Sequence, residues 1–309
     1  MTRYLELGAD IARRVASGEL VAGSELPSVR DLADRLGTTS STTSRAYRHL
    51  AEHGVLTVGD HRRARVPADG PLAARRLLDG EQVFRLAGSD DPALDVVLRI
   101  AGRTVVPVGN RGSFHGLTAL VRGTADGAAV HLLHRTGVYN APFGRALLRG
   151  RQPHLIHLWR REQGLLVPPG NPRQVTGSGD LANLRIAKRE VGAGTRVLLD
   201  RTLLDTGIAP EEVPGPELSS HLEVAIAVAS GIADTGLGVR AAAIDLDLDF
   251  VPLTWESYDI VTTEAALPAV APLAAALRDP AVQATILELG GYDLSDTGTI
   301  HALADRIPR

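Results

Sequence analysis

Hydrophobic residues near the start of the chain recur at the spacing of an amphipathic helix. Leu5, Ile11, Ala12 and Val15 lie on one face of such a helix. The pattern stops at the segment SGEL, where Gly18 suits a C-terminal cap. We therefore predict a first helix that ends at this glycine.

The segment LPSVRDLADRLG predicts a second helix with a clear start and a clear end. Ser28 is a good N-cap, Asp31 follows three residues later, and Gly37 ends the pattern. The apolar face of this helix is expected to consist of Val29, Leu32, Ala33 and Leu36.

A third helix is expected over residues 42–52, after the hydroxyl-rich turn GTTS. Its apolar face carries Ala46, Tyr47 and Leu50, which leaves hydroxyls and Arg45 at the exposed N-terminal end. Two short strands, GVLTV and RARVP, then flank a basic tip. Three helices and such a wing make a winged helix-turn-helix.

After residue 81 the pattern changes to short apolar strands that alternate with helical segments. The preceding segment PLAARRLLDGE, residues 71–81, predicts a connecting helix. Strands are expected in QVFRLAG, TVVPVG, AAVHLL, HLIHLW, GLLVPPGNP, RVLLD and AAAIDLDLDFVPL. Such alternation indicates an α/β architecture with parallel strands. The predicted fold class is multidomain, with a winged helix-turn-helix first and an α/β domain after it.

Composition narrows the class of protein. A chain of 309 residues, 44% of them hydrophobic, can form two or three domains with real cores. It has no cysteine, which excludes disulfides and thiolate metal sites. The N-terminus has regular charges where a signal peptide needs an apolar core, and the longest apolar run, LPAVAPLAAAL, is too short for a bilayer. We expect a cytoplasmic protein without a membrane segment.

The net charge of −3 hides a local basic cluster. Residues 1–70 carry +1 and the remainder −4, so neither part is strongly basic. The segment HRRAR, residues 61–65, holds three arginines and a histidine, which is enough for a loop tip that contacts phosphates. The alternative interpretation is an ordinary solvated loop.

The stretch LPSVRDLADRLGTTSSTTSRAYRHLAEHGVL resembles the winged-helix DNA-binding domain of the GntR family of bacterial transcription regulators. The resemblance covers about residues 1–67. It implies that the third helix enters the major groove of a double-stranded DNA operator, bound by a homodimer, while the wing reaches phosphates or the minor groove. The implied DNA-contacting positions and their neighbours are Arg30, Ser40, Ser41, Thr42, Ser44, Arg45, His61, Arg62 and Arg63.

Two features depart from the family pattern. Members commonly have arginines where this chain has Ser40 and Ser44, and their wings usually carry a Gly-x-Gly turn that GDHRRAR lacks. A serine offers one short hydroxyl instead of a bidentate fork, so guanine readout would move to Arg45 or weaken. For each hydroxyl the alternative role is helix capping and turn formation.

Four places where a strand leads into a helix share a chemistry. Helix N-termini offer unpaired N–H groups and the positive end of the dipole, so several that converge make an anion or polar-ligand site without a metal. Taken singly, each is an ordinary helix start. The residues at these four places are Ser89 with Pro92, Ser113, Tyr139 with Asn140, and Gly192, Gly194, Thr195 and Arg196.

A second resemblance covers about residues 82–290. The segments AGSDDPALD, HLLHRTGVYN, RREQGLLVPPGNP and LDFVPLTWESYDIV resemble the type 2 substrate-binding-protein-like domain related to periplasmic molybdate and tungstate receptors. That family has two α/β lobes, joined by hinge strands, that close on a ligand. The implied domains are 1–70 for DNA binding, 71–81 as linker and 82–309 for ligand sensing. The first lobe takes about 82–160 and 251–309, and the second about 161–250.

By position in those motifs, both lobes supply ligand-binding residues. Arg196 is the candidate for charge neutralisation, because a guanidinium holds an oxyanion or carboxylate by two hydrogen bonds. Its alternative is a surface ion pair with Asp200. Arg161 and Gln163 at the hinge are weaker candidates. The implied ligand-binding set is Ser89, Ser113, Tyr139, Asn140, Gly194, Thr195, Arg196, Asp234 and Glu256.

Two members of this set conflict with an anionic ligand. Asp234 and Glu256 would repel an oxyanion, so if they line the cleft they favour a ligand with an amine or hydroxyls. The histidines, His131, His134 and His221 among them, show no metal-binding spacing, and we interpret them as structural or capping residues. No metal and no cofactor is expected.

The sequence therefore predicts a ligand-responsive DNA-binding transcription regulator and not an enzyme. Its effector would be a small polar or anionic molecule, either a molybdate- or tungstate-type oxyanion or a small organic compound. The alternative is an enzyme, since GntR-type domains are sometimes fused to pyridoxal-phosphate-dependent aminotransferase-like domains. Lys188 is the only lysine and lacks a surrounding cofactor constellation, and no G-x-S-x-G elbow occurs.

Overall fold

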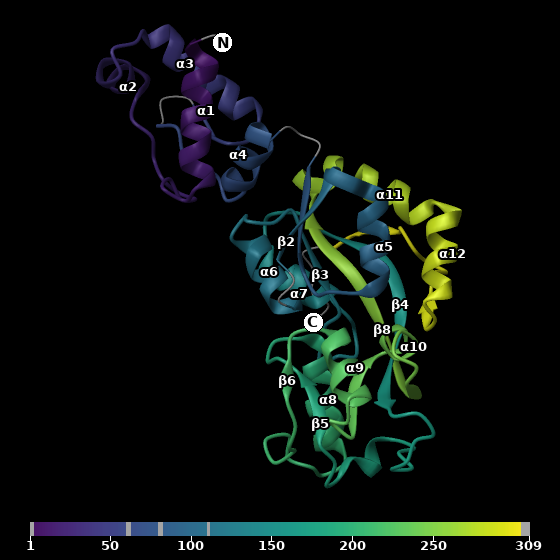
Figure 1. The fold of residues 1–309 in the computed structure, drawn as a ribbon. Helices are drawn as coiled ribbons and strands as arrows, with labels where there is room; N and C mark the ends of the chain where they lie inside the picture. Colours follow the sequence, from purple (N-terminus) through teal and green to yellow (C-terminus); the bar gives the residue numbers. More distant parts are fainter. Residues whose placement is uncertain (1–2, 60–62, 80–82, 110–111, 304–309) are drawn as a thin grey trace. The chain divides into compact units, whose positions relative to one another are not determined.

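The computed structural model describes residues 3–59, 63–79, 83–109 and 112–303, which form two compact units (Figure 1). The first unit is Met1–Val83 with Arg122–Asp126, and the second contains the rest of the chain.

Helices make up most of the first unit. Among the described residues they are α1 (Arg3–Ala16), α2 (Val29–Arg35), α3 (Ser40–Glu52) and α4 (Gly70–Asp79). The three helices predicted from the apolar pattern are confirmed. Ile11 and Val15 of α1 are buried with Tyr47 and Leu50 of α3 in one core.

The ends of α2 and α3 depend on hydroxyl caps. The Ser28 side chain accepts a hydrogen bond from the backbone N–H of Asp31, as predicted. Thr39 caps α3 by accepting from the N–H of Thr42 at 3.1 Å, so this helix begins at Ser40, two residues earlier than predicted. The prediction for Leu36 is wrong: it is the C-cap of α2 and 54% exposed, not part of the apolar face.

In the described part of the predicted wing, the two strands meet in one isolated antiparallel bridge, Thr57 with Arg65. Arg65 also forms an antiparallel bridge with Glu25, which precedes α2. The Arg65 guanidinium also donates to the Glu25 carboxylate at 2.6 Å. The predicted tip residues His61 and Arg62 lie outside the described residues.

Helix α4 stands where a linker was expected. It packs against α1, and its Leu72 and Ala74 side chains are buried. We therefore place residues 70–79 in the first unit, where they complete its core, and correct the predicted linker of residues 71–81 accordingly.

A mixed sheet forms the frame of the second unit, with strand order β2-β1-β3-β8-β4-β7-β5-β6. Pairs near its two ends are parallel, as the alternating pattern predicts, but the central pairs are antiparallel. The strands are β1 (Phe84–Gly88), β2 (Val105–Gly109), β3 (Gly127–Val130), β4 (Pro153–Val167), β5 (Ile186–Arg189), β6 (Glu217–Leu218), β7 (Thr235–Val239) and β8 (Asp249–Thr263), and the short β9 (Tyr292–Asp293) and β10 (Ile300–Ala302) also pair with β4.

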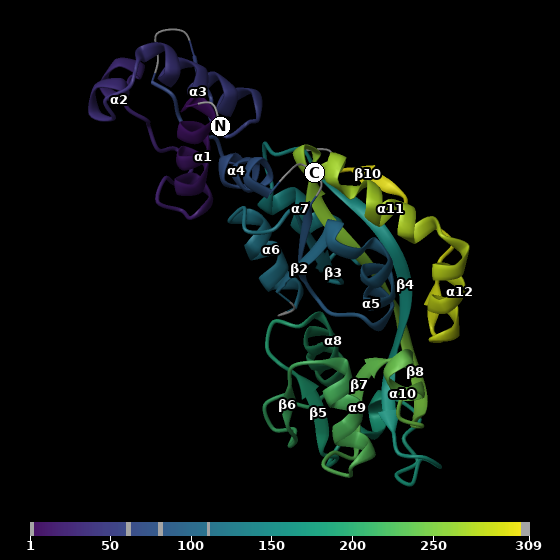
Figure 2. The ribbon, with the colours of Figure 1, turned by 45° about the horizontal axis from the view of Figure 1, so that its top comes forward.

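Two long antiparallel strands connect the two lobes of this unit. β4 and β8 pair along their whole length, from Pro153 opposite Thr263 to Val167 opposite Asp249. Both run through the first lobe, which holds β1 to β3, and the second lobe, which holds β5 to β7 (Figures 1 and 2). The segments HLIHLW and GLLVPPGNP were predicted as separate strands. HLIHLW and the GLLV of the second segment belong to one strand, β4, because the polar residues between them stay paired with β8, and PPGNP follows its end.

Helices flank the sheet in both lobes. Two segments predicted as strands contain helices instead: RVLLD lies inside α8, and the AAAI of AAAIDLDLDFVPL forms most of α10. Short apolar runs do not distinguish a strand from a buried helix by periodicity. The first lobe has α5 (Pro92–Ala101), α6 (Ser113–Val121), α7 (Ala141–Leu147), α11 (Ala271–Arg278) and α12 (Pro280–Glu288) with η1 (Gly102–Thr104) and η3 (Glu264–Val270), and the second has α8 (Gly194–Asp205), α9 (His221–Ala229), α10 (Arg240–Ile244) and η2 (Ser178–Leu181).

Candidate DNA-binding surface and ligand cleft

The N-terminal half of α3 presents a polar surface. Ser40, Ser41 and Arg45 are exposed there, as the third helix of a winged helix-turn-helix requires for contact with base edges. Arg48, also exposed, lies on the same face as Ser41 and Arg45, at spacings of seven and three residues. Arg48 was not predicted from the sequence, although its position one turn after Arg45 would have shown it.

The hydroxyls at the start of α3 divide into two groups. The Thr42 hydroxyl shares a hydrogen bond of 2.9 Å with the Thr39 hydroxyl, so it takes part in the cap, the alternative role. Ser44 is half-buried, whereas Ser40 and Ser41 extend from the first turn into solvent.

Arg45 is held by an aromatic ring of α1. Its guanidinium carbon lies 4.3 Å from the centroid of the Tyr4 ring, a cation–π contact. Tyr4 also meets the edge of His49 on α3. The exposed arginine at the start of the recognition helix is thus restricted in orientation. Arg30 at the start of α2 and Arg63 in the wing are exposed as well.

Glu256 on β8 is the centre of a buried polar cluster between the lobes. Its Oε1 accepts hydrogen bonds from Arg161 Nε and Gln163 Nε2, both at 2.7 Å, and its Oε2 lies 3.1 Å from His131 Nδ1. Burial alone would raise the pKa of Glu256, but the attraction of His131 and Arg161 lowers it to about 2. Glu256 is therefore an ionised, fully engaged acceptor.

His131, at the end of β3, connects this cluster to both predicted serines. Its Nε2 lies 2.9 Å from the Ser89 hydroxyl, and its backbone N–H donates to the Ser113 hydroxyl at 3.2 Å. Ser89 and Ser113 therefore both contact His131, one through its ring and the other through its backbone. His131, interpreted from the sequence as a structural or capping residue, thus lies between the two hydroxyls and Glu256.

Asp91 holds the other side of the Arg161 guanidinium. It is the N-cap of α5, accepting from the N–H of Ala93 at 2.8 Å, and it forms a buried ion pair with Arg161 NH1. The Tyr292 hydroxyl donates to the same carboxylate. Burial raises the pKa of Asp91, against the attraction of Arg161. Asp91 was not predicted from the sequence, although an Asp before the Pro92 of a helix start is a common N-cap.

An ion pair joins the two lobes. Arg189, at the end of β5 in the second lobe, donates to the Asp90 carboxylate of the first lobe at 3.0 Å and to the Ser219 carbonyl at 2.8 Å. The Arg189 side chain is 1% exposed. It too was not predicted from the sequence, even though it lies directly before the Gly-rich turn that leads into α8.

Several buried polar atoms around this cluster have no hydrogen-bond partner in the described part of the chain. They are Arg161 NH2, Gln163 Oε1, Arg189 Nε, Thr195 Oγ1 and both ring nitrogens of His221. Burial, and then the charges of Arg189 and Arg161, lower the pKa of His221 well below its ordinary value, so the ring is neutral. Buried polar groups are normally paired, so these atoms mark space for a polar ligand or ordered water. His221, interpreted from the sequence as a structural or capping residue, is thus one of the buried residues with unpaired polar atoms.

Gly194, the first residue of α8, touches His131 across the lobes. A Cβ built on this glycine would lie 2.5 Å from His131 Cε1, so only glycine allows the contact. Thr195 follows it, 1% exposed. Asn140 has φ of 53° and holds the turn before α7, because its side chain accepts from the Leu132 N–H and donates to Asp259.

Two predicted ligand contacts, Arg196 and Asp234, are engaged by partners within the second lobe. The Arg196 guanidinium is paired with Asp200 at 2.8 Å and Glu217 at 2.7 Å, which is the alternative that the sequence left open. Asp234 accepts hydrogen bonds from the backbone N–H and the guanidinium of Arg185. The hydrogen bond from the Arg185 side chain is the main reason that the pKa of Asp234 is lowered to about 2. Both residues stabilise the second lobe and do not line the cleft pocket.

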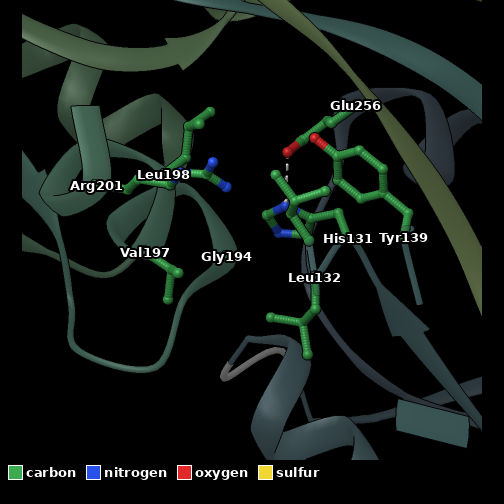
Figure 3. Close-up of a pocket in the computed structure, with 9 residues that line it drawn as sticks. His131, Leu132, Tyr139, Gly194, Val197, Leu198, Arg201 and Glu256 are labelled. Carbon is green, nitrogen blue, oxygen red and sulfur yellow. Dashed lines mark hydrogen bonds and ion pairs between the residues drawn. The ribbon is translucent and has the colours of Figure 1, made fainter. Parts of the chain in front are cut away.

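A small pocket opens beside the Glu256 cluster, between the lobes (Figure 3). Its volume is about 40 Å³. Burial, and then Glu256, raise the pKa of the neighbouring Tyr139 to about 12, so its hydroxyl keeps its proton. The lining residues are His131, Leu132, Leu133, Tyr139, Gly194, Val197, Leu198, Arg201 and Glu256.

The described residues contain no metal-ligand cluster, no membrane-spanning helix and no free lysine amine. No group of three or more potential metal ligands occurs in the described residues, and none of the helices there is long and apolar enough to cross a membrane. Lys188 Nζ is buried and donates to the Val213 carbonyl at 2.7 Å, which occupies the amine that a Schiff base would need.

The fold and the cleft define a class of protein: a two-lobed α/β binding domain preceded by a winged helix-turn-helix. The chain belongs to the PBP superfamily, whose domain model matches residues 99–278. The model described as "Bacterial regulatory proteins, gntR family" matches residues 3–66, so the first unit is a GntR-type DNA-binding domain.

Two curated proteins are similar to parts of this chain. The chain is 38% identical over 198 residues to "Uncharacterized protein YvgK" of Bacillus subtilis, a match that covers 62% of this chain and 63% of that protein. It is 39% identical over 51 residues to "HTH-type transcriptional regulator Rv1152" of Mycobacterium tuberculosis, covering 16% of this chain and 42% of that one.

Among the solved structures, two OxyR structures match almost the whole chain. One of them is a mutant of OxyR from Corynebacterium glutamicum, bound to H2O2, with a TM-score of 0.50 and 14% identity, and the match covers 93% of this chain and 94% of that one. At this identity the likeness concerns the fold.

Proposed function

We propose that the protein is a ligand-responsive, DNA-binding transcription regulator. Its N-terminal unit would bind a double-stranded DNA operator as a homodimer, in the cytoplasm where chromosomal DNA lies. Its second unit would bind a small polar or anionic effector between the lobes, either a molybdate- or tungstate-type oxyanion or a small organic molecule. The likeness to the OxyR structure over almost the whole chain supports the combination of such units at the level of the fold.

The observation that carries the proposal is the polar interior of the interlobe cleft. Arg189 reaches Asp90 across the lobes, while six buried polar atoms nearby have no partner among the described residues. Each such atom left unpaired costs about 1–3 kcal/mol, so a partner, either a polar ligand or ordered water, is expected beside them. A ligand that pairs with them only when the lobes are closed would shift the population towards closure, and its differential affinity would supply the coupling to DNA binding.

We propose the following residue roles. Ser40, Ser41, Ser44 and Arg45 would contact the operator from α3, with Thr42 in the cap, and Arg30, His61, Arg62 and Arg63 would contact it from α2 and the wing. The effector would contact Ser89, Ser113, Tyr139, Gly194, Thr195 and the group around Glu256. Asn140 would hold Tyr139 in place.

Two measurements test the proposal. Fluorescence anisotropy at moderate salt should show binding to a duplex from the region upstream of the gene, and no binding there would refute the regulator. A thermal-shift panel of molybdate, tungstate, sulfate, phosphate, organic acids and amines should identify the effector. A ligand at 100 times its Kd stabilises the folded protein by about 2.7 kcal/mol, which is easily detected.

A further inference from the structure

The interlobe pocket beside Glu256 has one charged end and apolar walls. The residues that α8 contributes, Gly194, Val197, Leu198 and Arg201, follow one another at spacings of three, one and three residues and therefore lie on one helix face. Figure 3 shows the Arg201 side chain directed across the pocket from α8 towards His131, with Leu198 and Val197 on the same side. The pocket thus pairs a single cation with a mainly apolar surface.

Arg201 is available to a ligand. Its only ion pair in the described chain is with Asp205, at 3.8 Å, and its side chain is 60% exposed. Arg196, earlier on the same helix, has two pairs at 2.7 and 2.8 Å. Arg201 is therefore the pocket cation that can donate two hydrogen bonds to an incoming anion.

Glu256 is already engaged by donors of the protein itself. Its Oε1 accepts from Arg161 and Gln163, and its Oε2 lies 3.1 Å from His131 Nδ1. A cationic ligand in this pocket would face the Arg201 guanidinium, while the Glu256 carboxylate is already paired with Arg161. This pairing reduces the conflict between Glu256 and an anionic ligand, because the carboxylate acts on the protein's own Arg161.

The apolar walls oppose an inorganic oxyanion. Leu132 of the first lobe and Val197 and Leu198 of the second line the pocket. A tetrahedral oxyanion directs oxygens to every side, so some of them would be desolvated against these side chains without a donor. A carboxylate concentrates its charge at one end and leaves an apolar tail for the walls.

We infer that the pocket binds a short-chain monocarboxylate, with the carboxylate on Arg201 and the alkyl chain between Leu132, Val197 and Leu198. The volume of about 40 Å³ holds about three water-sized groups, which fits an alkyl chain of two or three carbons whose carboxylate lies at the exposed end. The Tyr139 hydroxyl, which makes no hydrogen bond within the described residues, can serve a hydroxyl on that chain. This inference rests on the proposed function, because it takes the interlobe cleft as the effector site.

Titration calorimetry of the full chain with propionate and with molybdate tests the inference, at concentrations up to about 10 mM because so small a ligand binds weakly. Propionate should bind, and R201Q should weaken it at least about tenfold, the cost of a charge-assisted hydrogen bond. R173Q is the matched control: Arg173 lies in the same lobe, is 59% exposed and has one long ion pair, at 3.3 Å, but does not line the pocket.

The possible results are distinct. No heat with acetate, propionate or butyrate, or propionate binding that R201Q and R173Q leave equal, overturns the inference. Operator binding that responds to molybdate alone also overturns it but leaves the regulator intact. Propionate binding that depends on Arg201, in a protein that binds no operator, supports the inference and refutes the regulator.

Discussion

The buried carboxylate of Glu256 allows a prediction whose size follows from the structure. Its pKa falls from 4.5 to about 2 on folding, which corresponds to about 3 kcal/mol of stability near neutral pH, at about 1.4 kcal/mol per pH unit. The substitution Glu256→Gln removes this charge and leaves the buried Arg161 with Asp91 as its remaining ion-pair partner. Losing one partner of a buried pair costs about 3–5 kcal/mol. We expect the variant to lose about 3 kcal/mol of unfolding free energy.

The assay can be confined to the second unit. The two tryptophans of the chain, Trp159 and Trp255, both lie there, on β4 and β8. Urea unfolding followed by tryptophan fluorescence therefore reports on the lobes. The control is Glu264→Gln, at a residue whose side chain is 55% exposed and paired only with His154 in the described structure; it should cost at most about 1 kcal/mol.

The pH dependence supplies a second criterion. Because folding lowers the pKa of Glu256, its contribution is complete above pH 4.5 and is lost as the pH falls towards about 2. The difference between the wild type and Glu256→Gln should therefore narrow over this range. Equal unfolding midpoints at pH 7, or a difference that does not change between about pH 5 and 3, would refute the assigned role of the carboxylate.

Three further substitutions test other contacts. Gly194→Ala should prevent the lobes from closing, because the new Cβ would meet His131 at 2.5 Å. We expect calorimetry to show loss of effector binding while operator binding is retained. An unchanged affinity for the effector would contradict this role. Tyr4→Leu should weaken operator binding about two- to fivefold in anisotropy, because it removes the cation–π contact with Arg45, worth about 0.5–1 kcal/mol. Tyr4→Phe keeps the ring and should not weaken binding. Equal effects of the two substitutions would exclude a role of the cation–π contact. Arg196→Ala should keep full effector binding and lower thermal stability slightly; lost binding would restore it as a ligand contact.

The sequence predicted the elements of the fold better than their connections. Helices with strong caps, such as the one after Ser28, were found because their signals are local. The continuity of β4 was missed because Arg160 to Gln163 interrupt its apolar pattern. Arg161 and Gln163 can be buried inside the strand because they pair with Glu256 of β8, and Arg161 also with Asp91, the N-cap of α5. RVLLD was misassigned because its apolar residues fit a strand or a helix equally well.

The sequence indicated which strand ends hold the polar residues of the cleft, but not how their side chains pair. Ser89, Ser113 and Gly194 come together because strand ends converge, which the alternating pattern implies. Arg196 and Arg201 differ in their partners for a reason that sequence spacing does not contain. Both have an acidic residue four positions later, and only the fold brings Glu217 of β6 to Arg196 as a second partner.

Each buried guanidinium inside the cleft is matched by at least one carboxylate. Arg161 is matched by Asp91 and Glu256, and Arg189 by Asp90. An effector is therefore not needed to neutralise a buried cation, and a strongly charged one would lose hydration in this interior without a matching gain. The charge that remains to attract it is Arg201, at the solvent-exposed side of the pocket. This arrangement favours a singly charged ligand that keeps its charged end near solvent and buries the rest.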